Sequence, residues 1–426
     1  MQGNKTYLCI DLKTFFASVE CAERGLDPFT TNLVVADPSR GKGAICLAIS
    51  PALKALGIKN RCRLFDIPDH IKYITAMPRM KKYMEYSSRI YSIYLRYIAK
   101  EDIHPYSIDE MFLDVTNYLK IYKTTAIKMA EALMKKIQDE LHICATVGIG
   151  TNLFLCKIAL DITAKHSKSN IGYLDEEKFK AELWNHQPLS DFWQIASGME
   201  KRLNKLGLFT MRDISNADEE ILYKEFGINA EILIDHSNGI EPVTIEHIKN
   251  YKNKSHSISQ SQILFEDYEP HKARLILKEM VEVLSLQLVD RKLVTNNIGL
   301  YVGYSKDSNQ KGTGGSMKLT ICTNVFSKLL PSFLEIYDST TNFNCKVRRI
   351  GISFGNVLPE NYEYFDLFTN PEEVEKERKL AITINSLKKK YGKNSILKAM
   401  NLEEGATTRK RNTLIGGHNA ETKDEA

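Results

Sequence analysis

The sequence predicts a multidomain α+β protein, and three observations support this fold class. The chain has 426 residues, more than one ordinary domain of about 100–200 residues holds. Up to residue 168 it alternates short apolar runs with amphipathic stretches. Residues 169–245 then read as helical throughout, and residues 257–356 return to a pattern of strands and a long helix.

The N-terminal elements follow from the spacing of apolar residues. An apolar run over residues 6–10 predicts a strand that ends at Asp11. Apolar residues then recur at helical spacing, at Leu12, Phe15, Phe16 and Val19. Proline and glycine interrupt residues 26–76, which predicts a small mixed insert. A tyrosine-rich stretch over residues 84–98 predicts the next helix.

The next elements complete one sheet. Two apolar runs, residues 103–108 and 111–115, flank Asp109-Glu110 and predict a β-hairpin. Residues 124–141 have strong helical periodicity, and residues 143–149 are rich in β-branched side chains, which favour a strand. A helix through residue 165 follows. Without the insert the order is β-α-β-β-α-β plus one helix, the split βαβ arrangement.

The second half predicts a separate domain and a tail. Residues 246–256 are polar and suit a linker. Within residues 257–356 we expect a long helix and strands around a Gly-rich loop; these are the helix 271–291, the strand 297–304, the loop 312–315 and a further strand. Residues 357–426 predict one helix, over 372–391, and a polar, disordered end.

Composition excludes several classes of protein. Hydrophobic residues make up 43% and charged residues 26%, as in globular proteins. No apolar run approaches the roughly 18 residues of a membrane span, and the N-terminus turns acidic too early for a signal peptide. The eight cysteines contain no C-x-x-C pair, which argues against a disulfide framework or a zinc site. We therefore expect a cytosolic protein with reduced thiols and no membrane partner.

The net charge is 58 − 53 = +5, and its distribution is uneven. Residues 245–358 hold 15 Lys and Arg against 10 Asp and Glu, so 15 − 10 = +5 falls in this segment. A basic module on a neutral body indicates either a polyanion contact, such as nucleic acid, or a solvated face.

Three acidic residues form the candidate catalytic site. Asp11 closes the first strand, and Asp109 and Glu110 lie at the hairpin, which a split βαβ sheet places beside that strand. Carboxylates a few ångströms apart repel by about 4 kcal/mol per pair at an effective dielectric of 20. Oxygen ligands of this kind select Mg²⁺, and a pair of such ions roughly 4 Å apart supports nucleotidyl transfer. Taken singly, Asp11 is equally a helix cap and Asp109-Glu110 a solvated turn.

Three motifs give the chain a family resemblance. CIDLKTFFASVE (residues 9–20), YSIDEMFLD (106–114) and TVGIG (146–150, followed by Lys157 and Ala159) resemble motifs of the Y-family, or translesion, DNA polymerases in order and spacing. KALGIK (54–59) and RLFDIP (63–68) resemble the UmuC-like branch of Gram-positive bacteria, their plasmids and phages. The resemblance covers about residues 5–400.

The resemblance implies a right-hand polymerase. Its parts would be a palm (1–25 and 77–168), fingers (26–76), a thumb with a helix–hairpin–helix (169–245), a linker (246–256), a little finger (257–356) and a C-terminal tail (357–426). Asp11, Asp109, Glu110 and the carbonyl of Leu12 would hold two Mg²⁺ ions. Glu110 would lie nearest the primer 3′-hydroxyl.

The resemblance also implies contacts to the incoming nucleotide. Phe16, beside Phe15, would be the steric gate that excludes a 2′-hydroxyl, although its place in the apolar stripe equally fits the core. Lys165 and Lys54 would bind the triphosphate, with the spacing before Lys165 uncertain by one residue. Pro51 stands where related chains carry a phosphate-binding tyrosine, and Arg61 or Arg63 is a candidate to compensate.

DNA contacts are implied in two places and a clamp contact in a third. IASGMEKRL (residues 195–203), with Gly198, is similar to a helix–hairpin–helix, although Ala196 replaces its usual first glycine. Basic edge strands would contribute Lys254, Ser255, Arg348 and Arg349; alternation separates the two arginines unless a bulge intervenes. YFDLF (364–368) resembles a sliding-clamp peptide, with Tyr364, Phe365, Leu367 and Phe368 as contacts, or else packs on its own domain. Arg409-Lys410-Arg411 is a basic cluster with no assigned role.

The predicted function is template-directed, low-fidelity DNA synthesis past damaged bases, in SOS-type damage tolerance. Its substrates would be primer–template DNA and dNTPs, and a sliding clamp, a recombinase filament or an accessory subunit are candidate partners. Two alternatives are a nucleotidyl cyclase, which leaves the hairpin and basic domain unused, and a catalytically silent DNA- or clamp-binding protein, which leaves the carboxylates unused.

Overall fold

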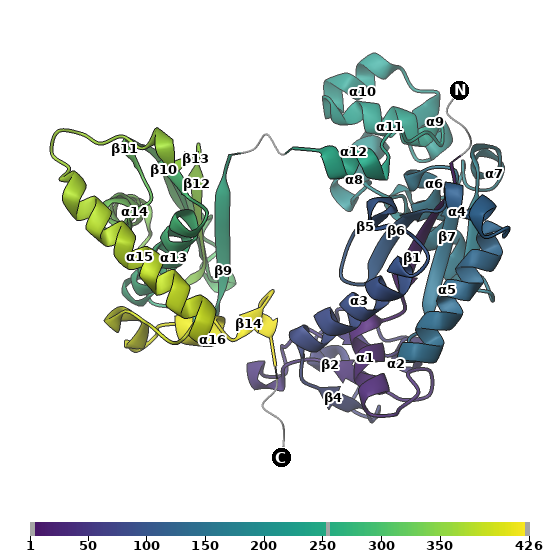
Figure 1. Ribbon diagram of the computed structural model, residues 1–426, viewed down its shortest axis with the longest axis horizontal. Coiled ribbons are helices and arrows are strands. Elements are labelled where there is room, and N and C mark those ends of the chain that lie inside the picture. The colour runs from purple at the N-terminus through teal and green to yellow at the C-terminus, as the bar shows by residue number, and fades with distance from the viewer. Residues whose placement is uncertain (1–4, 253–255, 422–426) are drawn as a thin grey trace. The chain divides into compact units, whose positions relative to one another are not determined.

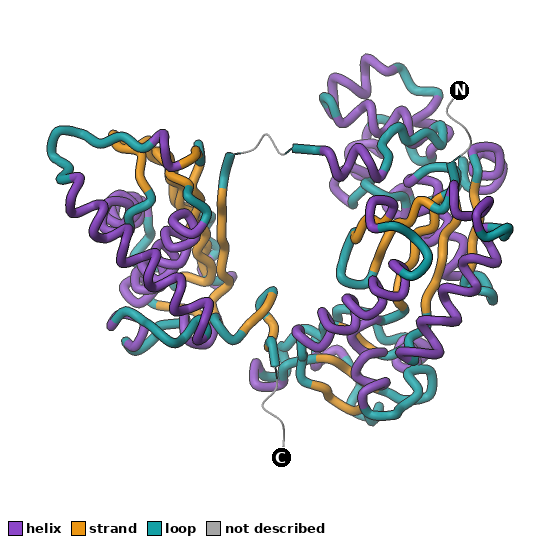
Figure 2. The backbone as a smooth tube through the Cα atoms, in the orientation of Figure 1, coloured by secondary structure: helices purple, strands orange, loops and turns teal. Residues whose placement is uncertain are grey.

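The computed structural model describes residues 5–252 and 256–421. The chain forms two compact units, residues 1–251 with 418–426 and residues 252–417 (Figure 1). Both combine sheets with helices, as Figure 2 shows. No helix among the described residues is long and apolar enough to cross a bilayer.

A five-stranded sheet forms the centre of the first unit. Its order is β5-β6-β1-β7-β8, and its strands are Ile103–Pro105, Glu110–Asp114, Tyr7–Leu12, Ala145–Gly150 and Ile171–Leu174. The central strand β1 is antiparallel to both neighbours. The four strands β5, β6, β1 and β7 have the order and connections of the split βαβ arrangement, to which β8 adds an edge.

Alternation along β1 assigns its side chains to two cores. Leu8 and Ile10 point toward the helices α1 (Phe15–Glu23), α3 (Met80–Leu95) and α5 (Ala126–Leu141), in the larger core. Tyr7 and Cys9 point to the opposite face, where α6 (Leu153–Ile158) packs. Asp11 is two residues from Cys9 on the same strand, so its side chain lies on the face of the sheet that α6 covers.

Glycine in β7 allows α6 to lie directly on the sheet. A Cβ atom at Gly148 would stand 2.1 Å from the carbonyl oxygen of Cys156, and one at Gly150 would stand 2.2 Å from its nitrogen. Any larger residue would therefore push the helix away. This close approach fixes where the side chains of α6 meet the central strands.

The predicted insert is a small domain with its own core. Strands β2 (Leu33–Val35), β3 (Ala48–Ile49) and β4 (Ile74–Ala76) form a sheet of order β3-β2-β4. Around it lie η1 (Pro38–Arg40), α2 (Pro51–Ala55) and η2 (Leu64–Asp66). Pro51 is the first residue of α2, a position where a missing N–H costs nothing.

After the sheet the first unit is helical, with two corrections to the sequence analysis. Residues 171–174 form strand β8 rather than helix, because they pair in parallel with β7. Residues 246–250 of the predicted linker belong to helix α12 (Ile245–Asn250), whose Ile245 is buried beside Tyr7. The other helices are α4 (Thr116–Ile121), η3 (Lys100–Asp102), α7 (Glu176–Glu182), η6 (Leu189–Asp191), α8 (Ser197–Lys205), α9 (Met211–Ser215), α10 (Glu219–Phe226) and α11 (Asn229–Ser237).

The second unit is built on a five-stranded sheet with helices on one face; four long strands follow one another, and the short strand β13 (Leu358–Pro359) pairs with one of them. Its order is β11-β10-β12-β9, with strands Thr313–Thr323, Leu293–Tyr304, Val347–Gly355 and Ile258–Tyr268. Helices α13 (Pro270–Asp290) and α14 (Phe326–Thr340) bury their apolar sides against it. The long helix α15 (Pro371–Tyr391) packs on α13, as Figure 1 shows.

Three expectations for residues 256–421 are wrong. The Gly-rich stretch is not a loop, because Gly314 and Gly315 lie inside β11 and the turn comes earlier, at η7 (Lys306–Ser308). Helix α14 was missed because Pro331 interrupts its pattern. The polar end is folded up to residue 421, with β13 (Leu358–Pro359), η8 (Glu360–Tyr362), η9 (Ala399–Leu402), α16 (Thr408–Arg411), β14 (Leu414–Ile415) and β15 (His418–Asn419).

Candidate functional site

Two of the three predicted acids face one another across adjacent strands. Asp11 on β1 is the register partner of Glu110, the first residue of β6. Both side chains point toward α6, because each shares its parity with the buried residues of that face, Cys9 and Phe112. Glu110 is buried and Asp11 is partly exposed.

The third acid, Asp109, lies in the loop immediately before β6. Its carbonyl oxygen accepts the backbone N–H of Leu12 at 3.0 Å, which ties the loop to the end of β1. Its carboxylate accepts the hydroxyl of Ser107 at 2.6 Å. The loop therefore holds Asp109 beside the strand end where Asp11 lies.

Glu110 has a buried lysine as its partner. The ammonium of Lys157, on α6, lies 2.7 Å from the Glu110 carboxylate and 3.0 Å from Asp161. The thiol of Cys9 donates to the same carboxylate at 3.1 Å. Burial alone would lower the pKa of Lys157, but its charged neighbours raise it, so the ammonium stays charged.

A π-helical turn brings a second lysine to Asp11. Residues Ala159–Thr163 form this turn, which holds more residues than an α-helical turn does. It is followed by η5 (Ala164–His166), and the ammonium of Lys165 lies 3.2 Å from Asp11.

Burial is the main cause of the unusual pKa of Asp11, and the neighbouring carboxylates add to it. Burial raises the pKa of Asp11 to about 6; Lys165 opposes the shift, while Asp109 and Glu110 contribute to it. Among the described residues no three acidic, histidine or cysteine side chains gather as metal ligands, and two lysines are paired with the carboxylates. The donor set is all oxygen and in excess of negative charge, so it fits a hard divalent cation.

Phe16 lies at the start of α1, partly exposed, whereas Phe15 is buried in the core. The ring of Phe16 packs on Tyr83 of α3, with centroids 4.6 Å apart. Phe16 is therefore neither a fully buried core residue nor a free side chain. One edge of its ring is fixed by α3.

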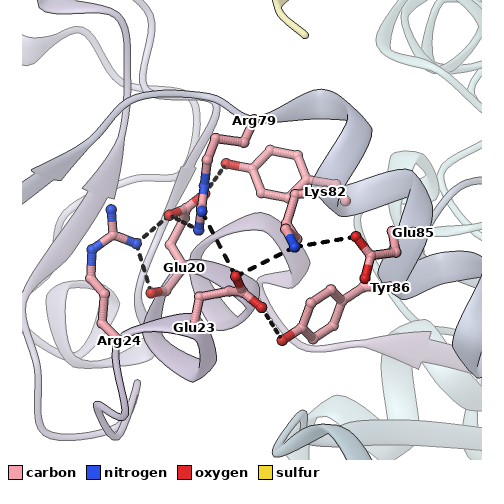
Figure 3. A network of polar contacts seen from close by, with 8 residues as sticks. Glu20, Glu23, Arg24, Arg79, Lys82, Glu85 and Tyr86 are labelled. Carbon is pink, nitrogen blue, oxygen red and sulfur yellow. Dashed lines mark hydrogen bonds and ion pairs between the residues drawn. The ribbon is translucent and has the colours of Figure 1, made fainter. Parts of the chain in front are cut away.

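A buried charge network holds α3 against α1 (Figure 3). Glu20 is fully buried and accepts two hydrogen bonds from Arg79, each 2.9 Å long. It also accepts the hydroxyl of Tyr83 at 2.8 Å and binds Arg24. Figure 3 shows a second carboxylate, Glu23, continuing this network toward Lys82, Glu85 and Tyr86. The network fixes Tyr83 and, through it, Phe16.

Lys13, which the sequence analysis did not select, also lies near this site. Burial lowers the pKa of Lys54; the charge of Asp11 opposes this shift, and the charges of Lys165 and Lys13 add to it. Lys13 also donates to Asn170. Arg63, in contrast, donates to the carbonyl of Gly43 in the insert.

The predicted DNA contact at Gly198 lies at the exposed start of helix α8. Ala196, Ser197 and Gly198 are all exposed, and α8 has no side-chain cap. A Cβ atom at Gly198 would meet no atom within 4 Å, so the fold does not require glycine there. The first N–H groups of the helix are open to an anion from solvent.

A bulge places both predicted arginines of β12 on one face. The pairing of β12 with β9 and with β10 shifts around Arg348, so Val347 and Ile350 both point inward. Arg348 pairs with Asp267 at 3.3 Å, and Arg349 donates to Ser261 at 2.8 Å and stacks on Tyr301. The other two predicted contacts, Lys254 and Ser255, lie outside the described residues.

The outer face of this sheet has a shallow depression, lined largely by serines and glycines. Its depression is formed by Ser259, Ser261, Gly299, Tyr301, Gly315, Ser316, Gly351 and Ser353, among others. Small side chains let a bulky partner approach the sheet backbone.

The predicted clamp peptide is half anchored and half exposed. Tyr364 pairs with Cys322 through the backbone, and its hydroxyl accepts Asn296 at 2.9 Å. Phe365 is partly buried, whereas Leu367 is 100% exposed and Phe368 is 95% exposed. The carboxylate of Asp366 accepts the N–H of Phe368 at 3.1 Å and so fixes this turn.

Sequence reasoning missed several residues of the site. Lys157, within the third motif, received no role, although a lysine four residues before an aspartate on one helix is a visible ion-pair signal. Glu20 closes the first motif but received no role, and Arg79 and Tyr83 gave no signal, because a buried network between distant elements is not visible in the spacing of residues.

Comparison with known proteins identifies the family. Residues 10–161 match the impB/mucB/samB family and residues 255–367 its C-terminal domain. The chain is 33% identical over 97% of its length to a putative UV-damage repair protein, UvrX, of Bacillus subtilis, again over 97% of that protein. It is 28% identical to DNA polymerase IV 2 of the same organism, over 98% of this chain and all of that one.

The chain belongs to the Y family of DNA polymerases. A solved Y-family polymerase chimera shares its fold, with a TM-score of 0.63 and 21% identity over 83% of this chain and 99% of the other. As a member of the UmuC-like branch, the protein is a DNA-directed DNA polymerase that carries out translesion synthesis. The expectation of this family from the three motifs is confirmed.

Proposed function

We propose that this Y-family polymerase extends primers past damaged bases by nucleotidyl transfer at a site that Asp11, Asp109 and Glu110 form. The observation that carries the proposal is the pairing of Asp11 with Glu110 on adjacent strands, under two lysines of the α6 segment. The carbonyl of Leu12, at the end of the same strand, would add a fourth oxygen. These donors would hold two Mg²⁺ ions.

The bound metals would supply the charge for the chemical step, and side chains of the protein would position the reacting groups. When bound, two divalent cations would lower the pKa of the primer 3′-hydroxyl and stabilise charge on the departing pyrophosphate. Within the chain, the ammonium of Lys157 lies 2.7 Å from the Glu110 carboxylate and orients it. Lys165, released from Asp11 in the loaded site, would bind the triphosphate together with Lys54 and Lys13.

Phe16 would select the sugar of the nucleotide. Its ring is braced on Tyr83, so a 2′-hydroxyl cannot displace it cheaply. Pro51 would contribute no hydrogen bond to the phosphates. Lysines around Asp11 supply that charge instead.

The parts of the chain would serve as palm, fingers, thumb and little finger, with the bounds given above. The α8 start, at Gly198, would bind one DNA phosphate through its N–H groups. Arg348 and Arg349 would bind the duplex backbone on the outer face of the second unit. The insert is small, with β strands of two or three residues. A small fingers domain would contact the nascent base pair loosely, and loose contact would tolerate a damaged base.

Primer extension on an undamaged template and on one with an abasic site tests the proposal. With Mg²⁺ and all four dNTPs we expect extension past the lesion. Asp109→Ala and Glu110→Ala should lose extension and still bind DNA. Extension by either variant would remove the metal-ligand assignment, and no extension by the parent chain would favour a DNA-binding protein that does not copy.

We also propose that residues 364–368 bind a sliding clamp. The support is the full exposure of Leu367 and Phe368 on a turn that Asp366 fixes, because fully exposed apolar side chains side by side mark a docking peptide. Replacing Phe365, Leu367 and Phe368 with Ala should abolish stimulation of extension by the clamp. Undiminished stimulation would assign the contact elsewhere. A recombinase filament or accessory subunit, and expression in an SOS-type response, complete the proposed setting.

A further inference from the structure

The segment after α15 is an ordered part of the second unit. The family match ends at residue 367, whereas the fold of this unit continues to residue 417. Within the additional length, η9 contacts α13, and α16 lies near the end of β9 (Figure 1). The basic cluster of residues 409–411 forms most of α16.

A buried carboxylate fixes α16 in place. Glu279, on α13, is 1% exposed and accepts four hydrogen bonds from this segment. Two come from the backbone N–H groups of Thr407, at 2.8 Å, and Thr408, at 3.2 Å. The others come from the Thr407 hydroxyl and the Asn401 amide, both at 3.1 Å. Burying a carboxylate this completely costs free energy unless hydrogen-bond donors surround it. The four bonds from this segment satisfy Glu279 and so fix the position of the segment on α13.

Further bonds tie the same segment to the edge of the sheet. The amide of Gln262, on β9, donates to the Thr407 hydroxyl at 3.0 Å. Beyond α16, Asn412 bonds to Asn394 at 2.7 Å, and Asn394 donates to the carbonyl of Arg409 at 3.1 Å. The segment is therefore bonded both to Glu279 on α13 and to Gln262 on the edge strand β9.

This bracing divides the basic cluster into one inward and two outward residues. Arg411 is partly buried; burial lowers the pKa of its guanidinium, and Glu279 opposes that effect. Arg409 and Lys410 are exposed. In the described part of the chain neither of these two side chains has a carboxylate partner. The ammonium of Lys410 lies 4.2 Å from the ring centre of Phe265, on β9.

That position continues the basic face formed by β12. Ile263 on β9 is the register partner of Arg349, and Phe265 is two residues further along the same strand, where the pairing with β12 shifts. Lys410 is placed by its contact with Phe265, which puts its ammonium close along β9 to the partner of Arg349. Arg348, also on this face, is already partly neutralised by Asp267.

We propose that Arg409 and Lys410 bind backbone phosphates of the DNA duplex and extend the basic face of the second unit around its edge strand. The inference rests on the proposed DNA contact of Arg348 and Arg349. A phosphate backbone is the partner that fits, because it is a regular row of anions that two unpaired cations meet without reading sequence. The adjoining face is a shallow depression with serine hydroxyls, glycines and the exposed ring of Tyr301, rather than an enclosed pocket that would hold an anchoring side chain of a peptide.

Salt dependence of binding to primer–template DNA tests the proposal in the full chain. Each phosphate contact adds about −0.9 to the slope of log K against log salt. The variant R409A/K410A should therefore have a slope shallower by about 1.8, with an unchanged melting temperature, since neither side chain bonds to Glu279. The matched control K376A/K379A removes two charges from α15, on the helix side of the sheet, and should leave the slope nearly unchanged. The variant R348A/R349A measures the underlying DNA contact.

The outcomes separate the two hypotheses. A shallower slope for R409A/K410A and not for K376A/K379A supports the inference. A slope changed by R348A/R349A alone overturns the inference and leaves the proposed function intact. Equal changes of the slope in R409A/K410A and K376A/K379A would mean that DNA binding depends only on the total charge of the protein, and this result would also overturn the inference. No change in R348A/R349A would remove the DNA contact on which it rests.

Discussion

Phe16 is the single residue whose role depends most on its surroundings. Its ring is held on one side by Tyr83, which is itself fixed by its hydroxyl bond to Glu20. We predict that Phe16→Ala admits ribonucleotides, because removing the ring opens space for a 2′-hydroxyl. The ratio of kcat/KM for dCTP and CTP should fall by about 10- to 200-fold, the range that a hydrophobic pocket provides.

A matched variant separates the gate from the core. Tyr83→Phe keeps the ring contact and loses only the hydroxyl bond to Glu20, so it should change sugar discrimination far less than Phe16→Ala. If Phe16→Ala lowers stability but leaves the dCTP/CTP ratio unchanged, Phe16 belongs to the core alone.

At the scale of elements, the packing of α1 on α3 depends on a buried ion pair. Glu20 has no exposed surface, and Arg79 supplies two of its hydrogen bonds (Figure 3). We predict that Arg79→Met lowers the free energy of unfolding by about 3 kcal/mol, because a buried carboxylate loses its main partner while Arg24 remains. Urea denaturation measures this loss. Adding Glu20→Gln to Arg79→Met should recover part of it, and no recovery would show that the loss comes from packing.

The C-terminal strand β15 gives a second prediction for elements, one that depends on pH. Within the first unit, the carbonyl of Ala420 accepts the N–H of Lys81 at 2.9 Å, a donor that the first turn of α3 leaves unpaired. Burial and then Arg40 lower the pKa of His418 below its usual 6.5, whereas Asp37 opposes the shift.

The sign of the effect follows from proton binding. The released segment binds a proton to His418 near pH 6.5, and the docked segment binds it only at lower pH, so docking weakens as pH falls below about 6.5. Hydrogen exchange at the Lys81 amide, corrected for its intrinsic rate, should be faster at pH 5.5 than at pH 7.5. His418→Gln should remove this difference, and a difference that persists would assign it to another group.

At the scale of the whole molecule, the two units have separate cores, and damage to one should stay within it. Glu279 belongs to the second unit and accepts four hydrogen bonds there. Glu279→Leu would leave buried N–H groups unpaired, at about 1–3 kcal/mol each. We predict faster hydrogen exchange across residues 256–417 and unchanged exchange across residues 5–251. Equal acceleration in both units would show that they unfold together.

Much of the fold was predictable because its elements are long or strongly patterned. The helices predicted over 124–141, 271–291 and 372–391 are α5, α13 and α15, within two residues at each end. The misses have local causes. Pro331 hid α14, and residues 399–419 have too few apolar positions to show that a buried Glu279 organises them. Short elements of this kind are stabilised by contacts with distant residues, which periodicity does not record.

The family, the strand that carries Asp11, the hairpin that carries Glu110 and the order of the sheet all follow from the sequence, because motifs and hydrophobic period act over neighbouring residues. Which charges meet depends instead on tertiary packing. The close approach of α6 at Gly148 brings Lys157 to Glu110, a π turn brings Lys165 to Asp11, and a bulge turns Arg348 and Arg349 to one face. Such pairings depend on packing distances of a few ångströms between residues far apart in the chain, and spacing along the chain carries no record of those distances.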